Sequence, residues 1–315
     1  MKRRLIIFIL FVSQLGFAQK ESSVQPFLPD IFKQFSSVRD FTISSSQDEA
    51  FFTAQSSLGE LSVIINIKKE NRKWSEPEIA PFSGKYQDLE PFITPDGLRL
   101  FFASNRPLSD TTNKAKDFDI WYVQRENRNS TWSSPINIDP PINTENNEFY
   151  PSVVTNNNLY FTSDASNSKG KDDIFFSEWQ DGHYSTPVSM SDSINSEGYE
   201  FNAFISPDES FMIFSGYNRE DGFGSGDLYI SFQNSSGTWS EAKNLGSEIN
   251  SDKMDYCPFV DANTKTMYFT SKRSQLDYLP SGFKTIHELL SEMNKYENGL
   301  SRIYQVSMEH ILIDR

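Results

Sequence analysis

The sequence is poor in the residues that most often carry catalysis or cross-links. It has one cysteine, Cys257, and three histidines, His183, His287 and His310, among 315 residues. A single cysteine excludes an intrachain disulfide. We interpret Cys257 as a buried, inert thiol, because it lies in the apolar start of a predicted strand with neither His nor Lys beside it. The histidines share no metal-ligand spacing, so the sequence predicts no metal site.

Motifs of common enzymes and cofactor sites are also missing. There is no G-x-S-x-G motif, and the glycine-rich run at 222–226 precedes a predicted strand rather than a helix. No Lys follows that run, so it does not form a phosphate loop. No D-x-D-x-D-G loop is present, so Ca²⁺ is possible but no motif indicates it. We therefore predict no cofactor and no catalytic residue, and favour a protein that is not an enzyme.

Long apolar runs are absent as well, since no stretch approaches the roughly 20 residues of a transmembrane helix. At the N-terminus, residues 2–4 are basic, residues 5–12 are apolar and residues 16–18 form a small-x-small cleavage site. This order predicts a secretory signal peptide over residues 1–18. No cysteine follows the cleavage site, which argues against a lipid anchor. We expect a periplasmic or secreted protein without a membrane span.

Basic residues are outnumbered, with 29 Lys and Arg against 43 Asp and Glu and a formal net charge of −14. A chain of this charge repels nucleic acid and anionic membranes. The acidic balance suits solubility, and it would attract cations or basic ligands only if carboxylates cluster. Nucleic acid is therefore not expected as a partner.

The sequence does contain a repeat of four short segments with β-strand patterns. In its clearest copy we predict strands at 90–94, 98–104, 119–125 and 132–138, with Pro95-Asp96-Gly97 as the first turn. Similar units start at Asp88, Glu148, Glu200 and Asp255, and a degenerate one starts near Val38. A four-stranded repeat of roughly 40–50 residues is typical of a β-propeller blade.

We predict an all-β fold in which residues 38–315 form one propeller domain. Five repeats are visible, and six blades are the alternative. The segment 19–37 is too short for a blade but could supply a strand that closes the ring on the last sheet. Residues 310–313 could complete that sheet instead. Closure is expected because an open ring would leave unpaired sheet edges.

In several units an Arg follows the second strand and an Asp begins the third. We predict structural pairs between Arg106 and Asp119 and between Arg219 and Asp227, because a feature repeated in every blade maintains the blade.

The last unit contains an insertion, in which residues 283–296 predict an amphipathic helix. Ile286, Leu289, Leu290 and Met293 form one apolar stripe. Such a helix either packs over one face of the propeller or serves as a lid or partner-docking element.

Four segments resemble the WD40-like PD40 repeats that occur in the TolB propeller and in many exported bacterial proteins. They are TPDG (94–97), LFFASNR (100–106), DIWY (119–122) and WSSPIN (132–137). The resemblance covers roughly residues 38–307, although residues 155–158 and 261–264 depart from the PDG turn. It implies a propeller that acts as a protein- or ligand-binding platform, sometimes attached to a hydrolase.

Acidic and aromatic residues open the predicted first strands, which in a propeller line the central channel. The candidate ligand-binding residues are Asp88, Glu90, Glu148, Tyr150, Glu200, Asp255 and Tyr256. A ring of carboxylates and aromatic rings at one channel mouth could bind a cation, a basic peptide or a sugar. Alternatively, the acids bond neighbouring turns and the aromatic rings pack between blades.

Two classes of function remain open. The first is a binding or scaffolding module for a protein, peptide or glycan of the cell envelope, favoured by the missing catalytic motifs. The second is a propeller hydrolase or lyase that acts on a carbohydrate, lactone or peptide, with channel-mouth carboxylates as acid and base. A channel carboxyl with a strongly raised pKa would favour the second.

Overall fold

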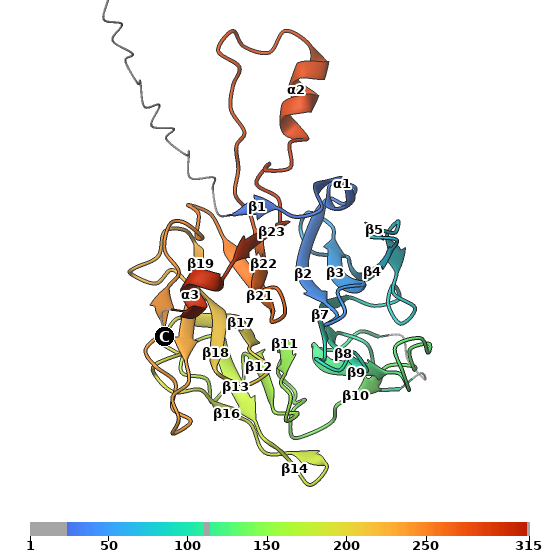
Figure 1. The fold of residues 1–315 in the computed structure, drawn as a ribbon, viewed down its shortest axis with the longest axis vertical. Helices are drawn as coiled ribbons and strands as arrows, with labels where there is room; N and C mark the ends of the chain where they lie inside the picture. Colours follow the sequence, from blue (N-terminus) through green and yellow to red (C-terminus); the bar gives the residue numbers. More distant parts are fainter. Residues whose placement is uncertain (1–23, 110–113, 314–315) are drawn as a thin grey trace, which may run out of the picture.

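The computed structural model describes residues 24–109 and 114–313, which form a five-bladed β-propeller (Figure 1). Each blade is a small antiparallel sheet, and in four of the five blades all strands follow one another in the sequence. The first strand of every blade lies innermost and contacts the first strands of both neighbouring blades. The prediction of five blades is confirmed.

The strands of blades 1 and 2 come from residues 37–137. Blade 1 comprises β2 (Ser37–Ile43), β3 (Glu49–Gln55), β4 (Ser62–Glu70), β5 (Lys73–Trp74) and β6 (Glu78–Ile79). Blade 2 comprises β7 (Asp88–Ile93), β8 (Arg99–Ser104), β9 (Asp119–Gln124) and β10 (Ile136–Asn137). The predicted strands of blade 2 are therefore present, but the fourth is reduced to two residues because Pro135 has no N–H to donate to the sheet.

Blades 3 and 4 repeat this plan. Blade 3 comprises β11 (Glu148–Val153), β12 (Leu159–Ser163), β13 (Asp173–Ser177) and β16 (Val188–Ser189), with β14 (Trp179–Gln180) and β15 (His183–Tyr184) as an outer hairpin. Blade 4 comprises β17 (Tyr199–Ile205), β18 (Phe211–Tyr217), β19 (Gly226–Phe232) and β20 (Lys243–Asn244).

Blade 5 joins the two ends of the described chain. It comprises β21 (Asp255–Asp261), β22 (Thr266–Ser271), β23 (Arg302–Ser307) and β1 (Gln25–Pro26). β1 pairs antiparallel with β23, so the N-terminal segment supplies the closing strand as predicted. Phe27 strengthens this closure, because its ring lies 5.1 Å from that of Phe41 and 4.7 Å from that of Tyr268. The alternative is wrong, since residues 309–313 form a helix.

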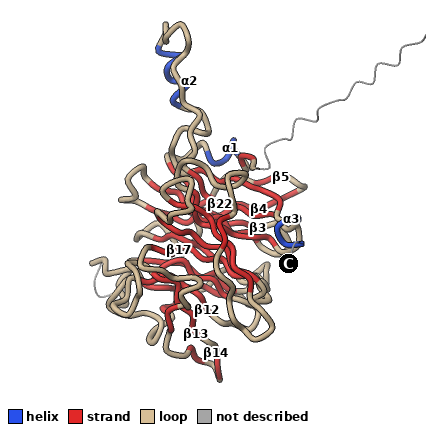
Figure 2. The backbone as a smooth tube through the Cα atoms, turned by 90° about the vertical axis from the view of Figure 1, so that its left-hand side faces the viewer, coloured by secondary structure: helices blue, strands red, loops and turns tan. Residues whose placement is uncertain are grey.

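Three helices accompany the strands in the described part of the chain. They are α1 (Pro29–Phe32), α2 (Ile286–Met293) and α3 (Glu309–Ile313). α2 lies in the predicted insertion, but it projects away from the propeller instead of covering a face (Figures 1 and 2). Within residues 24–109 and 114–313, none of the helices has the length and apolarity needed to cross a membrane.

Candidate functional site

The inner strands share a bulge that directs one side chain of each blade towards the channel axis. Between each first and second strand the pairing register shifts by one residue at the same place. The residue at the shift has a positive φ in all five blades: Asp40, Glu90, Tyr150, Asn202 and Cys257. A bulge leaves one residue unpaired and changes the direction of its side chain. The repeat therefore places five different side chains at equivalent positions.

These side chains and Arg39 form a buried polar cluster, which we call the axial cluster. The Arg39 guanidinium lies 2.7 Å from a carboxylate oxygen of Asp40 and 2.7 Å from one of Glu90. Asn202 donates to Glu90 at 3.3 Å, and the Cys257 thiol donates to Asn202 at 3.3 Å. These contacts join residues of blades 1, 2, 4 and 5 at the axis.

Glu90 has a structural reason to occupy its position. In three blades the N–H of the bulge residue donates to a threonine hydroxyl of the preceding blade, as Glu90 N–H does to Thr53 at 3.1 Å. The equivalent residue of β8 is Ala103, which has no hydroxyl. The Tyr150 N–H donates instead to the Glu90 carboxylate at 2.7 Å. Burial raises the pKa of Glu90, and Arg39 acts in the opposite direction.

Cys257 is buried in the axial cluster. Burial raises the pKa of its thiol well above the ordinary value, because the thiolate would lose its hydration. The interpretation of Cys257 as a buried thiol is confirmed, although its polar surroundings were not predicted.

Four of the predicted site acids lie away from the axis, at the start of the first strands. Asp88, Glu148, Glu200 and Asp255 are fully buried. In three blades an arginine bonds both the acid and a carbonyl of the loop that enters the blade. The ion pairs are Arg106–Asp88 at 2.6 Å, Arg219–Glu200 at 2.9 Å and Arg273–Asp255 at 2.9 Å.

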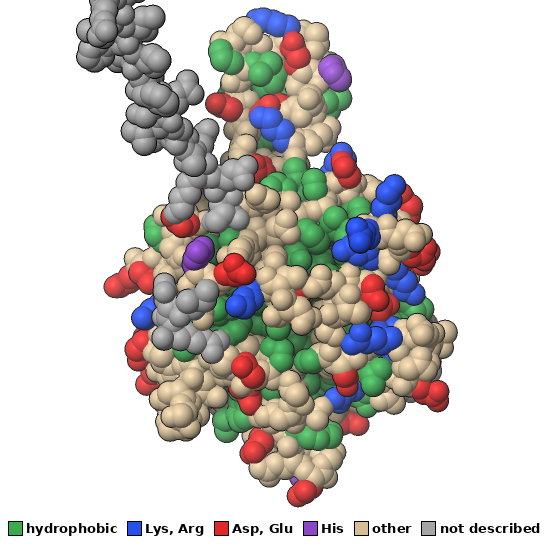
Figure 3. Space-filling model, viewed as in Figure 1, with side chains coloured by type: hydrophobic (Ala, Val, Ile, Leu, Met, Phe, Trp, Pro, Cys, Tyr) green, Lys and Arg blue, Asp and Glu red, His purple; other side chains and the backbone are tan. Residues whose placement is uncertain are grey.

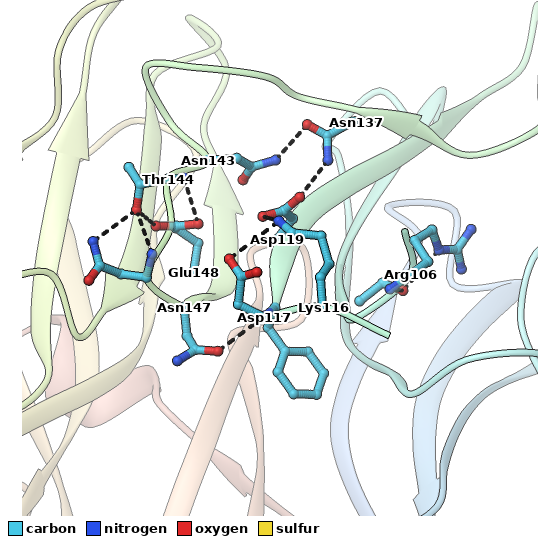
Figure 4. A network of polar contacts seen from close by, with 12 residues as sticks. Arg106, Lys116, Asp117, Asp119, Asn137, Asn143, Thr144, Asn147 and Glu148 are labelled. Atoms are coloured by element: carbon cyan, nitrogen blue, oxygen red, sulfur yellow. Dashed lines mark hydrogen bonds and ion pairs between the residues drawn. The ribbon is translucent and has the colours of Figure 1, made fainter. Parts of the chain in front are cut away.

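The predicted pairing of Arg106 with Asp119 and of Arg219 with Asp227 is therefore wrong. Asp119 instead pairs with Lys116 at 2.5 Å and accepts from Asn137 at 2.8 Å (Figure 4). Asp227 accepts backbone N–H groups of residues 223 and 224. These arginines follow the second strand, whose end pairs with the start of the first strand. Their side chains therefore reach the acid at that start.

Glu148 differs from the other three acids because no arginine reaches it. Ala165 stands two residues after Ser163, which is where Arg106 and Arg273 stand relative to Ser104 and Ser271 in their blades. Among the described residues, Glu148 accepts only from Thr144, from its N–H at 3.1 Å and its hydroxyl at 2.7 Å (Figure 4). Burial is the main cause that raises the pKa of Glu148 to about 7; Asp119 and Asp117 add to the rise, and the hydrogen bonds from Thr144 act in the opposite direction.

The predicted site residues therefore separate into two groups. Glu90 and Tyr150 meet at the axis, and Tyr256 lies beside them with its ring 5.2 Å from the Arg39 guanidinium. The four acids at the strand starts lie apart from them. Sequence reasoning missed Arg39, Asp40, Asn202 and Cys257. All five bulge residues could have been compared directly, because each opens the matching segment of its repeat: DFTI, EPFI, YPSVV, NAFI and CPFV.

At the opposite end of the channel, the turns between first and second strands surround an apolar groove. Its part at the axis is a 190 Å³ pocket floored by Phe92, Phe204 and Phe259. The Phe204 and Phe259 rings pack edge to face at 5.3 Å. A second pocket of 490 Å³ shares Phe204, Pro207, Val260 and Ala262 with the first and extends to Leu312 of α3. We call the two together the axial groove.

The groove follows one particular blade junction. Hydrogen bonds tie the turns of neighbouring blades at the four other junctions: Ser45–Pro95, Arg99–Asn157, Thr155–Pro207 and Asn263–Ser45. The axial groove runs along the remaining junction, between blades 4 and 5. It is an apolar surface bordered by the polar ends of turns, as in most ligand sites. In the described ranges, no group of three His, Cys, Asp or Glu side chains is arranged to hold a metal.

No family model matches the sequence, and no curated protein matches it. The resemblance to PD40 repeats therefore stays an interpretation of the sequence.

Solved structures with a similar fold include the catalytic domain of the GH62 α-L-arabinofuranosidase of Coprinopsis cinerea, at 9% identity and TM-score 0.50, covering 87% of this chain and 91% of that chain. The putative TolB of Agrobacterium tumefaciens is 12% identical with TM-score 0.48, covering 74% of this chain and 69% of that one. TolB of Acinetobacter baumannii is 12% identical with TM-score 0.47, and the match covers 86% of this chain but only 55% of that chain. These identities limit the likeness to the fold.

Proposed function

We propose that this protein is a non-catalytic propeller that binds an extended segment of a partner protein in the axial groove. The observation that carries the proposal is the groove itself, in which three phenylalanines at the axis continue into an apolar trough between blades 4 and 5. The axial pocket has room for one large apolar side chain, and the trough has room for the residues that follow it. Burial of apolar side chains in a preformed site is the main source of affinity for such segments.

Charge disfavours an acidic segment. The chain carries a formal net charge of −14, which repels acidic partners. The predicted signal peptide, residues 1–18, lies outside the described residues; with it, the proposed partner would be in the periplasm or outside the cell. The resemblance to PD40 repeats, whose propellers serve as binding platforms, agrees with this function.

Hydrolysis by channel carboxylates is the alternative, and the raised pKa of Glu90 is the feature that favours it. The burial and hydrogen bonds of Glu90 argue against this catalytic role. Glu90 is 4% exposed, one oxygen bonds Arg39 and Asn202, and the other accepts from the Tyr150 backbone. A glycosidase needs two carboxyl groups that face a sugar, whereas Asp40 and Glu90 both face Arg39.

The proposal is tested by selecting binders from a library of short random peptides on the purified chain. Ala262, an exposed residue of the groove, is changed to Arg to obstruct it. The control is Ala115→Arg, at an exposed position on the β8–β9 loop at the other end of the sheets. We expect selected peptides to share an apolar residue, and to lose at least tenfold in affinity with the Ala262 variant only.

Equal affinity for both variants would place the binding elsewhere and overturn the proposal. Aryl-glycosides and oligosaccharides are tested in parallel, and turnover that disappears in Glu90→Gln would establish the alternative.

A further inference from the structure

The segment between β22 and β23, residues 272–301, is the largest departure from the repeated plan; we call it the arm. The other four blades connect these strands with residues 56–61, 105–118, 164–172 and 218–225. Figures 1 and 2 show the arm extending well beyond the propeller, with α2 near its tip.

Specific contacts hold the arm in shape. At its base, the Gln275 N–H donates to the Glu297 carbonyl at 2.9 Å, and Tyr296 donates to the carbonyls of Phe27 and Ile303. α2 begins with a capping box in which Thr285 and Glu288 each accept from the other's backbone N–H. The helix is therefore stabilised locally, since it buries no residue of its own.

Large apolar side chains are concentrated on this ordered arm. Ile286, Leu290 and Met293 are 71%, 49% and 55% exposed, and Tyr278 in the irregular segment before α2 is 82% exposed. Figure 3 shows hydrophobic side chains at the surface of the arm. The helical residues are spaced i, i+4 and i+7, so they lie on one face. That spacing is typical of a helix that binds in a groove.

A second copy is a poor occupant for this face. Three aliphatic side chains of about 100 Å² each, doubled by symmetry, bury roughly 600 Å², whereas a stable interface buries about 1,200 Å² or more. A groove can surround the helix and also cover Tyr278, so it buries more of each side chain.

A lipid surface is no better. Interfacial helices carry a cationic face, and α2 has Glu288 and Glu292 but neither Lys nor Arg within its bounds.

We infer that α2 docks in an apolar groove of a partner protein, with Ile286, Leu290 and Met293 as anchors. The arm is rigid at its base and projects its apolar face away from the propeller, so the partner can be bound without contact to the axial groove. This inference does not depend on the proposed function.

The test uses the full chain in the cells that produce it, with the photo-crosslinking amino acid p-benzoylphenylalanine in place of Leu290. The matched control carries it at Ser291, which is exposed on the opposite side of α2. The crosslinked protein is identified by mass spectrometry and purified, and its affinity is measured for the wild type and for the double variant Ile286→Ser, Met293→Ser. Circular dichroism and thermal unfolding check that this variant folds.

We expect one discrete adduct from position 290 that is missing from position 291, and a loss of affinity of at least tenfold in the double variant. Three results would overturn the inference: no adduct from position 290, equal adducts from both positions, or unchanged affinity. Dimerisation in light scattering, or binding to phosphatidylethanolamine–phosphatidylglycerol vesicles, that the double variant abolishes would assign the face to a second copy or to lipid instead.

Discussion

Substitution of Ala165 by arginine would place a guanidinium beside Glu148, as in the three other blades that have an acid at this position. By analogy with Arg106, which bonds Asp88 and the Phe82 carbonyl, the new side chain would bond Glu148 and the Ile142 carbonyl. In the wild type Glu148 is fully buried, and Thr144 is its only donor in the part of the chain that the structure describes. The substitution therefore supplies blade 3 with the cation that the other three acids have and Glu148 lacks.

The size of the effect follows from the pKa of Glu148. Its rise from 4.5 to about 7 corresponds to a penalty of at most about 3 kcal/mol for the ionised folded state. Solvent screening and the ordering of the arginine reduce what a new ion pair can recover to roughly 1–2 kcal/mol. For a domain of this size, that gain raises the thermal midpoint by about 2–4 °C.

The gain should depend on pH. Between pH 4.5 and 7 the folded wild type holds a proton on Glu148 that the unfolded chain has released, so the free energy of unfolding falls as pH rises. A guanidinium beside Glu148 lowers the pKa of this carboxyl in the folded state, so the free energy of unfolding no longer falls over this pH range. Urea unfolding at several pH values should therefore show a small difference between Ala165→Arg and wild type at pH 5 and the full difference at pH 8.

Two controls isolate the charge. Ala165→Gln has a long side chain without a cation and should give no pH-dependent gain. In a Glu148→Gln background, Ala165→Arg should lose its advantage. A gain that is equal at pH 5 and pH 8, or that survives in the Glu148→Gln background, would refute the reasoning.

Three further predictions follow from the same structure. Arg106→Met leaves the buried Asp88 carboxylate without its cation and should lower the free energy of unfolding by about 3–5 kcal/mol in urea titrations; adding Asp88→Asn should recover much of this. Cys257 should not react with 5,5′-dithiobis(2-nitrobenzoic acid) until the protein unfolds, and rapid labelling of the native protein would contradict its burial. A chain without residues 19–28 lacks the closing strand and Phe27, and should melt earlier and aggregate through the exposed edge of β23, as measured by light scattering; unchanged melting would show that β1 is dispensable.

The repeat made most of the fold predictable. Each blade alternates β-rich segments with turns at regular spacing, and sheets with two apolar faces must stack on one another. The sequence left two candidates for the strand that closes the ring, in residues 19–37 and in residues 310–313. It could not decide between them, because a two-residue strand such as β1 has no periodic pattern of its own. The position of α2 was not predictable either. An apolar stripe defines one face of a helix, but it does not specify whether this protein or another one covers that face.

The site was harder to predict than the fold. Asp88 and Glu90 both open the predicted first strand of their unit, so the sequence predicts both at the channel mouth; in a regular strand they would also lie on the same face. The bulge at Glu90 breaks this alternation, so Glu90 reaches the axis while Asp88 stays at the strand start beside Arg106. Such a register shift depends on the backbone conformation, and the local composition does not predict it.

The most direct test of the binding proposal is hydrogen exchange measured with and without a peptide selected on the wild-type chain. We predict slower exchange in the turns around the axial groove, at residues 94–97, 206–210 and 261–265, while the outer strands of blades 1 and 2 are unchanged. Protection confined to those outer strands or to the strand starts at Glu148 and Glu200, with the turns around the groove unaffected, would contradict the account.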